Sequence, residues 1–150
     1  MHSNVHRMQL TSVTANRLVF DGQITGRPIS LLLSFDNGRD LRLAVAEDGT
    51  AMLVDDLPLD EPFDMGSDGS IVVEDVTDAI SPKLRHAELT DVRALTLNAR
   101  QVGVRLHLGG REEFNFWVED DELFWGDGTA LTTHPWLGGH APALGEALNV

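Results

Sequence analysis

Hydrophobic and polar residues alternate along much of the chain, with the period of two that is typical of β-strands. The clearest alternation covers four segments, residues 29–35, 41–45, 102–108 and 114–118. Each segment is predicted to form an antiparallel strand with one face in the core. Weaker alternation predicts further strands over residues 8–14, 18–25, 50–54, 70–75 and 91–98.

Residues that favour tight turns separate these segments. Asp48-Gly49 lies between two predicted strands and tolerates the positive φ angles of a hairpin turn. Gly109-Gly110 separates another pair of predicted strands. We therefore predict a mostly β protein, an antiparallel meander of about eight to ten short strands that forms a β-sandwich or a partly open barrel. Other Asp-Gly or Asn-Gly pairs stand at 21–22, 37–38, 68–69 and 127–128.

The sequence favours at most one short helix. Residues 76–89 are the best candidate, but Pro82 interrupts any helix there. Residues 57–66 contain two prolines and are expected to form a loop. We expect residues 1–150 to form a single domain, with a flexible tail over about 138–150, where Gly, Ala and Pro are frequent.

The composition is that of a soluble globular protein, with 42% hydrophobic and 23% charged residues. The chain has no cysteine, which excludes disulfides, thiol nucleophiles and cysteine-ligated metals. Residues 1–10 lack the apolar run of a signal peptide, and the longest aliphatic run is too short to cross a membrane. We therefore expect a cytoplasmic protein without membrane association. The single Lys among eleven basic residues favours a bacterial origin.

The net charge of −13 is unevenly distributed along the chain. Residues 47–78 carry eleven acidic side chains and residues 112–150 carry eight, with no Lys or Arg in either segment. Residues 83–111 carry six basic and two acidic side chains. Direct nucleic-acid binding is not expected, because phosphate contacts need a basic surface. A basic protein partner would complement the charge, although high charge also serves solubility alone.

Two acidic patches are candidate surfaces for a partner. If Phe114 and Phe116 point into the core, the period of a strand places Trp117 outward beside carboxylates. There Trp117 could stack with arginine, or it could instead lie under the tail or under Trp136. The candidate residues are Asp55, Asp56, Asp60, Glu61 and Asp64 in the first patch, and Trp117, Glu119, Asp120, Asp121 and Glu122 in the second.

Patterns for catalysis or metal binding are weak. Residues 64–75 partly match a calcium loop of the EF-hand kind, but Gly66 stands where a ligand is needed. An ordinary Asp-Gly turn is the favoured interpretation of that segment. The six histidines have no ligand spacing, and neither a nucleophile elbow nor a phosphate-binding loop occurs. We therefore predict no enzymatic activity, no metal and no cofactor.

The small size, the acidity and the lack of catalytic motifs resemble those of bacterial immunity proteins, which neutralise toxins. Nuclease toxins are basic because they hold nucleic acid, so an acidic inhibitor can cover their active site. We predict an acidic protein-binding module of this kind. The alternatives are a β-barrel or sandwich that binds a sugar, a lipid or calcium, an enzyme whose site one sequence does not reveal, and an accessory subunit of a larger assembly. The sequence does not specify the oligomeric state.

Overall fold

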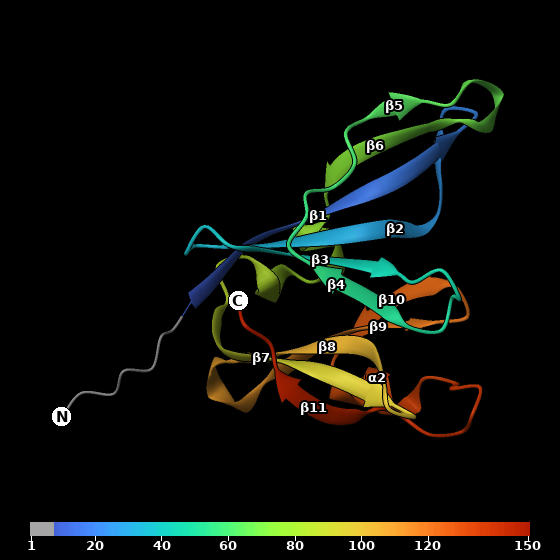
Figure 1. Cartoon of the computed structure of the whole chain (residues 1–150). Helices are drawn as coiled ribbons and strands as arrows, with labels where there is room; N and C mark the ends of the chain where they lie inside the picture. The colour runs from blue at the N-terminus through green and yellow to red at the C-terminus, as the bar shows by residue number, and fades with distance from the viewer. Residues whose placement is uncertain (1–7) are drawn as a thin grey trace.

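The computed structural model describes residues 8–150 and consists mostly of antiparallel strands (Figure 1). The predicted mostly β, antiparallel architecture is confirmed. The strands are β1 (Met8–Phe20), β2 (Gln23–Phe35), β3 (Asp40–Val45), β4 (Met52–Asp55), β5 (Phe63–Asp64), β6 (Ser70–Asp75), β7 (Glu88–Leu97), β8 (Arg100–Leu108), β9 (Glu113–Glu119), β10 (Glu122–Gly126) and β11 (Ala143–Ala147).

The strands form one continuous sheet that folds over on itself without closing, so that two layers face each other. One layer has the order β5-β6-β1-β2-β3-β4, and the other has β7-β8-β9-β10 with β11 beside β7. The layers are joined where Met8 and Gln9 of β1 pair with Leu89 and Glu88 of β7. The result is a β-sandwich with β1 as the strand that both layers share.

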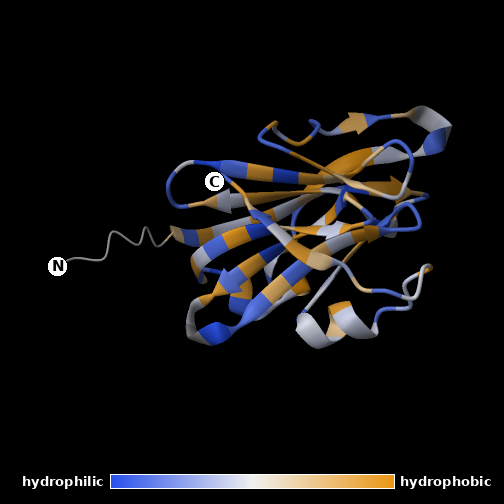
Figure 2. Ribbon diagram, turned by 60° about the horizontal axis from the view of Figure 1, so that its bottom comes forward, coloured by the Kyte–Doolittle hydropathy of each residue, from blue (hydrophilic) through white to orange (hydrophobic). Residues whose placement is uncertain are grey.

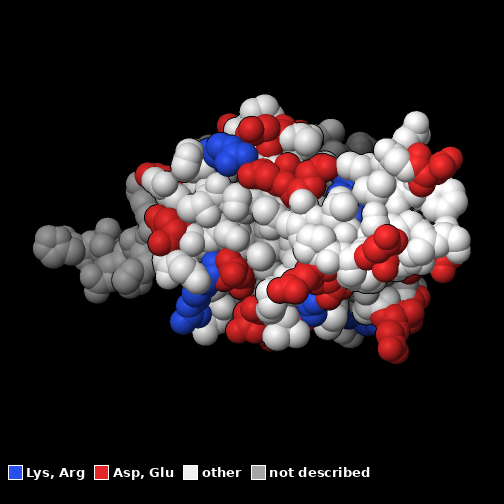
Figure 3. Space-filling model, turned by 90° about the horizontal axis from the view of Figure 1, so that it is seen from above, with Lys and Arg blue, Asp and Glu red and all other residues white. Residues whose placement is uncertain are grey.

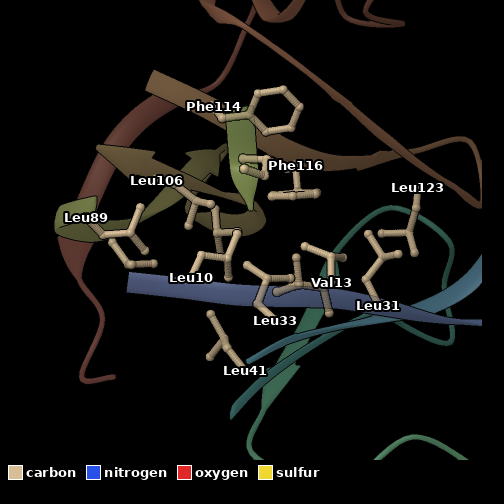
Figure 4. Packing of buried hydrophobic residues seen from close by; sticks show 14 of the residues in the cluster. Leu10, Val13, Leu31, Leu33, Leu41, Leu89, Leu106, Phe114, Phe116 and Leu123 are labelled. Carbon is tan, nitrogen blue, oxygen red and sulfur yellow. The ribbon is translucent and has the colours of Figure 1, made fainter. Parts of the chain in front are cut away.

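The main core lies between the two layers. Leu10, Val13 and Leu33 from one layer point toward Leu106 and Phe116 from the other (Figure 4). All five side chains are fully buried. Hydrophilic and hydrophobic residues alternate along the strands (Figure 2), as expected for strands with one face in a core.

The first hairpin differs from the prediction. Residues 18–25, predicted to be one strand, are instead the end of β1, a turn and the start of β2. Asp21 and Gly22 form that turn with φ angles of 55° and 77°. Both values lie in the left-handed region that a two-residue hairpin turn needs, which Asp and Gly tolerate.

The helical segments are short. The structure has two α-helices, α1 (Thr77–Ile80) and α2 (Gly128–Thr133), whereas the sequence favoured at most one. Pro82 starts a 3-10 turn directly after α1, so the proline does interrupt the segment 76–89. Asp127 caps α2 by accepting a hydrogen bond from the Ala130 amide at 2.8 Å. Among residues 8–150, no helix is long and apolar enough to cross a membrane.

The C-terminal segment lies against the sandwich. β11 pairs with β7, and the Leu148 amide donates to the Val92 carbonyl at 2.8 Å. Leu148 and Val150 pack against the main core. The flexibility expected for residues 138–150 stays a prediction, although part of this segment makes these contacts.

Candidate functional site

A cavity of about 420 Å³ lies at one end of the sandwich. Three hairpin turns surround it, namely those that join β3 to β4, β7 to β8 and β9 to β10. The segment 136–138, which follows α2, forms the remaining wall. The Asp121 amide donates to the Gly49 carbonyl at 2.9 Å, so the turn of one layer is tied directly to the turn of the other.

The inner wall of this cavity is apolar. Leu97, Val102 and Val118 come from β7, β8 and β9. Trp136 adds its indole ring, which is held in place because its Nε1 donates to the Leu131 carbonyl at 2.8 Å. The floor is therefore built from ordered strands and an anchored ring, not from loop side chains alone.

The rim of the cavity is acidic. Glu47 and Asp48 lie on the turn between β3 and β4, and Asp120 and Asp121 form the turn between β9 and β10. Asp48 pairs with Arg100, and this hydrogen bond is the main cause that lowers its pKa to about 2. Glu47, Asp120 and Asp121 have no ion-pair partner among the residues that the structure describes. Three carboxylates therefore remain uncompensated around an apolar floor.

Asp120 and Asp121 are held on a tight turn. Their φ angles are 50° and 67°, which places both residues in the left-handed region. Asp tolerates this conformation better than most residues, and a two-residue turn of this type gives little freedom to its backbone. The short turn therefore fixes where the two carboxylates leave the backbone.

Glu119 has a structural role in the wall of the cavity. Its Oε1 lies 2.8 Å from His134 Nε2, and its Oε2 accepts a hydrogen bond from the Leu137 amide at 2.9 Å. The carboxylate is 13% exposed. Glu119 therefore holds the segment around Trp136 against β9 and is already engaged, unlike its neighbours Asp120 and Asp121.

Trp117 is buried, which rules out its predicted role as an exposed stacking surface. Only 2% of the residue is exposed. It packs with Leu131 of α2 and with Trp136, whose ring centroid lies 6.2 Å from its own. Both faces of β9 are covered, because α2 and the segment after it form a second small core on the outer side. The alternative placement of Trp117 under Trp136 is the one observed.

The first acidic patch lies at the other end of β4 from the cavity. Asp55 is engaged with Arg42, whose Nη2 lies 2.6 Å from Asp55 Oδ2. The backbone of Asp60 is hydrogen-bonded to Asn16, and Asp64 Oδ1 accepts a hydrogen bond from the Gly66 amide at 2.8 Å.

The other two acids of the first patch, Asp56 and Glu61, are exposed. Asp56 borders a hollow of about 670 Å³ that Arg39 also lines. This patch mixes charges and does not form one acidic surface.

A second, smaller cavity adjoins the acidic turn. Its volume is about 300 Å³, and Asp121 and Glu122 line it together with Ile29 and Val45. Arg27 forms another wall and is held by its hydrogen bond to the Leu123 carbonyl and by the ring of Phe124, 4.4 Å from the guanidinium. Asp121 thus stands between two cavities, at the centre of the second predicted patch.

The calcium-like segment does not gather its carboxylates. Asp75 accepts hydrogen bonds from Thr77 and Arg85, with distances of 2.7 Å and 3.1 Å, while Asp64 bonds to its own turn. The Thr77 bond is the main cause that lowers the pKa of Asp75. Within the described part of the chain, no group of three His, Asp or Glu side chains is placed to hold a metal ion.

Comparisons of the chain with protein-family models, with curated proteins and with solved structures give no match. Function is therefore argued from the geometry of the site. The sequence missed Glu47 and Asp48 as members of that site, although the predicted Asp48-Gly49 hairpin was a signal. Asp120 and Asp121, which the sequence assigned to one candidate patch, lie together at the rim of the cavity, and their role in binding a partner stays a prediction.

Proposed function

We propose that the chain is an acidic protein-binding module that neutralises a basic partner through the acidic cavity end of the sandwich. The observation that carries this proposal is the combination of an apolar cavity with uncompensated carboxylates at its rim. Glu47, Asp120 and Asp121 contribute those carboxylates. Such a surface offers both a place to bury apolar atoms and charges that a cationic partner can pair.

The distribution of charge over the molecule supports a cationic partner. The chain has a net charge of −13, and the face seen from above in Figure 3 carries many more acidic than basic side chains. A field of one sign speeds the encounter with an oppositely charged protein, and this gain falls as salt is added. The cavity end would then provide the short-range contacts after the encounter.

The partner class we favour is a basic toxin of bacterial origin, with this chain as its immunity protein. A nuclease has a basic active-site surface because it holds phosphate groups. A compact acidic sandwich could cover that surface and exclude nucleic acid by charge and by bulk. Inhibition of this kind requires no catalytic group, metal or cofactor in the inhibitor.

A small-molecule binding function is the second candidate. The cavity of about 420 Å³ falls within the range of about 300–1,000 Å³ that is usual for ligand sites. Of the three tryptophans, only Trp136 lines this cavity. A single indole ring gives a sugar or a lipid less aromatic surface than a pocket lined by all three tryptophans would give.

The test begins with an affinity pull-down of the tagged protein from its own cells at low and at high salt. We expect a stoichiometric basic protein that elutes as salt rises and that is toxic when expressed alone. Capture of no such protein, together with a monomeric bait, would overturn the proposal in favour of a small ligand.

Two charge-reversal variants then locate the surface. D120K/D121K reverses the acidic turn, and D56K/E61K reverses two exposed acids of the other patch. Both variants change the net charge from −13 to −9, because each substitution adds two. We expect D120K/D121K to slow association by about tenfold at low salt and to weaken its salt dependence. Equal effects of the two variants would show that only the total charge matters.

A further inference from the structure

We infer that the cavity between the three turns receives one arginine side chain of the partner. This inference rests on the proposed function and adds the group that anchors the complex. The occupant must bring both apolar atoms and positive charge, because the cavity joins an apolar floor to an acidic rim. Arginine does so in one side chain, with an aliphatic stem below a planar guanidinium.

The floor of the cavity suits the stem. Leu97, Val102 and Val118 contribute apolar side chains from three adjacent strands, and Trp136 adds its indole ring. A stem of methylene groups that lies on this wall loses contact with water and gains dispersion contacts. A compact cation without a stem, such as ammonium or a hydrated metal ion, would gain none of these apolar contacts.

The rim suits a guanidinium. Glu47 approaches from the turn of one layer, whereas Asp120 and Asp121 approach from the turn of the other. Acceptors that approach from two sides need donors that point in several fixed directions. The guanidinium has five N–H donors in one plane, whereas the lysine ammonium is a flexible point charge with three.

The cationic side chains of this chain that lie nearby are already engaged. Arg100 is paired with Asp48 at the rim. Arg27 donates to the Leu123 carbonyl and lies over the rings of Phe124 and Trp125. Neither lines the cavity itself, so within residues 8–150 no arginine or lysine fills it. The partner is therefore the source of the positive charge.

The site is also organised before a ligand arrives. The bond from the Asp121 amide to the Gly49 carbonyl fixes the distance between the two acidic turns. Glu119 holds the segment 136–138, which forms another wall, through His134 and the Leu137 amide. A preformed site loses less conformational entropy when it binds, which raises affinity for a ligand of matching shape.

The experiment is an amide NMR titration of the intact protein with N-acetyl-arginine methylamide as the probe. The matching lysine and citrulline derivatives are titrated in parallel, because citrulline keeps the shape of arginine without its charge. We expect the arginine probe to bind with a Kd of about a millimolar and to shift the Gly49, Asn98 and Asp121 amides and the Trp136 indole. The lysine probe should bind several-fold more weakly, and the citrulline probe should cause no shifts.

Two neutralised variants complete the test. D120N/D121N should raise the Kd of the arginine probe at least fivefold. D56N/E61N, in the distant patch, should change this Kd less than twofold. Unchanged amide chemical shifts for residues away from the substituted positions would show that each variant is folded. Equal binding of the lysine or citrulline probe, or shifts that map outside the cavity, would overturn the inference.

The two proposals fail in different ways. If the pull-down captures a basic partner that elutes with salt while the arginine probe shifts no signal of the cavity residues, the result supports the protein-binding function and contradicts the arginine anchor. If the probe binds as expected but no protein partner is captured, the cavity is a site for small guanidinium compounds and the protein-binding proposal falls.

Discussion

Asp55 and Arg42 face each other directly across β3 and β4. Two hydrogen bonds join them, from Arg42 Nε to Asp55 Oδ1 at 2.8 Å and from Nη2 to Oδ2 at 2.6 Å. This bond pattern is the main cause that holds the pKa of Asp55 below its usual value and that raises the pKa of Arg42. A paired, two-bonded carboxylate of this kind stabilises a fold more than a freely solvated one does.

The stability contributed by Asp55 should depend on pH with a definite sign. Because the pKa is lower in the folded state, the contribution is complete above the unfolded pKa of about 3.9 and is lost as pH falls through the folded pKa. We expect Asp55→Asn to lower the free energy of unfolding by about 1 kcal/mol at pH 7. The difference from the unmutated protein should shrink as pH falls below about 4, as measured by urea unfolding over a series of acid pH values.

Asp56→Asn provides the matched control for this experiment, because Asp56 is exposed and has no ion-pair partner in the described part of the chain. Its effect on unfolding should be small at every pH. If the free energy of unfolding of Asp55→Asn stays lower by the same amount at every acid pH at which the protein folds, the pairing with Arg42 is not the cause.

Single residues also show where the sequence ceased to be informative. The alternation correctly places Phe114 and Phe116 in the core. The same alternation suggests that Trp117 is exposed, but periodicity does not reveal a second layer, and α2 covers the outer face of β9. The pairing of Asp55 with Arg42 likewise depends on strand register, which composition and spacing do not determine.

At the scale of elements, one buried side chain holds the loop between β4 and β5. Asn16 of β1 is 1% exposed. Its Nδ2 donates to the Asp60 carbonyl at 2.9 Å, and its Oδ1 accepts from the Asp60 amide at 3.0 Å. The hydroxyl of Ser30 donates to the same Oδ1 at 3.0 Å. The loop therefore gains through one side chain the backbone partners that a neighbouring strand would otherwise supply.

We expect Asn16→Ala to release this loop. Loss of the side chain leaves the Asp60 amide and carbonyl without their buried partner, which should cost about 2 kcal/mol. Hydrogen–deuterium exchange should accelerate in the peptide that covers residues 56–62. Ser30→Ala is the control, because it keeps both bonds between Asn16 and Asp60 and should leave exchange in the loop unchanged. Slow exchange of the loop in Asn16→Ala would refute the anchoring role.

Elements with a strong local pattern were predictable, and those that depend on tertiary contacts were not. The turn at Asp48-Gly49 was correct because a strong turn signal stands between two alternating segments. β11 was missed because a sequence of Ala, Leu, Gly and Glu has little strand propensity, and its pairing with β7 stabilises it instead. β10 was not predicted as a strand, although it pairs with β9 along its whole length.

At the scale of the whole molecule, the cavity is assembled from parts that are distant in sequence. Glu47 and Asp121 are separated by more than seventy positions, but the bond between the Asp121 amide and the Gly49 carbonyl brings their turns together. The sequence could indicate that both turns are acidic and tight. It could not indicate that the two ends meet, because that follows from how the sheet folds over itself.

The main core, to which both layers contribute, predicts that the two layers unfold together. Leu33 of β2 is fully buried in one layer, whereas Trp117, Trp125 and Trp136 all belong to the other layer or its outer cover. Leu33→Ala should therefore lower the free energy of unfolding by about 3 kcal/mol. The transitions seen by tryptophan fluorescence and by far-UV circular dichroism should shift equally.

Leu137→Ala makes the same chemical change at a side chain that is 81% exposed, and we expect it to change stability by less than about 0.5 kcal/mol. If Leu33→Ala shifts the circular dichroism transition but leaves the fluorescence transition in place, the layers unfold independently. Coincident shifts mean that a change in β2 is transmitted to the layer that carries Trp136. In that case the two acidic turns, one from each layer, keep their relative position for as long as the protein is folded, and the cavity between them is a property of the whole fold.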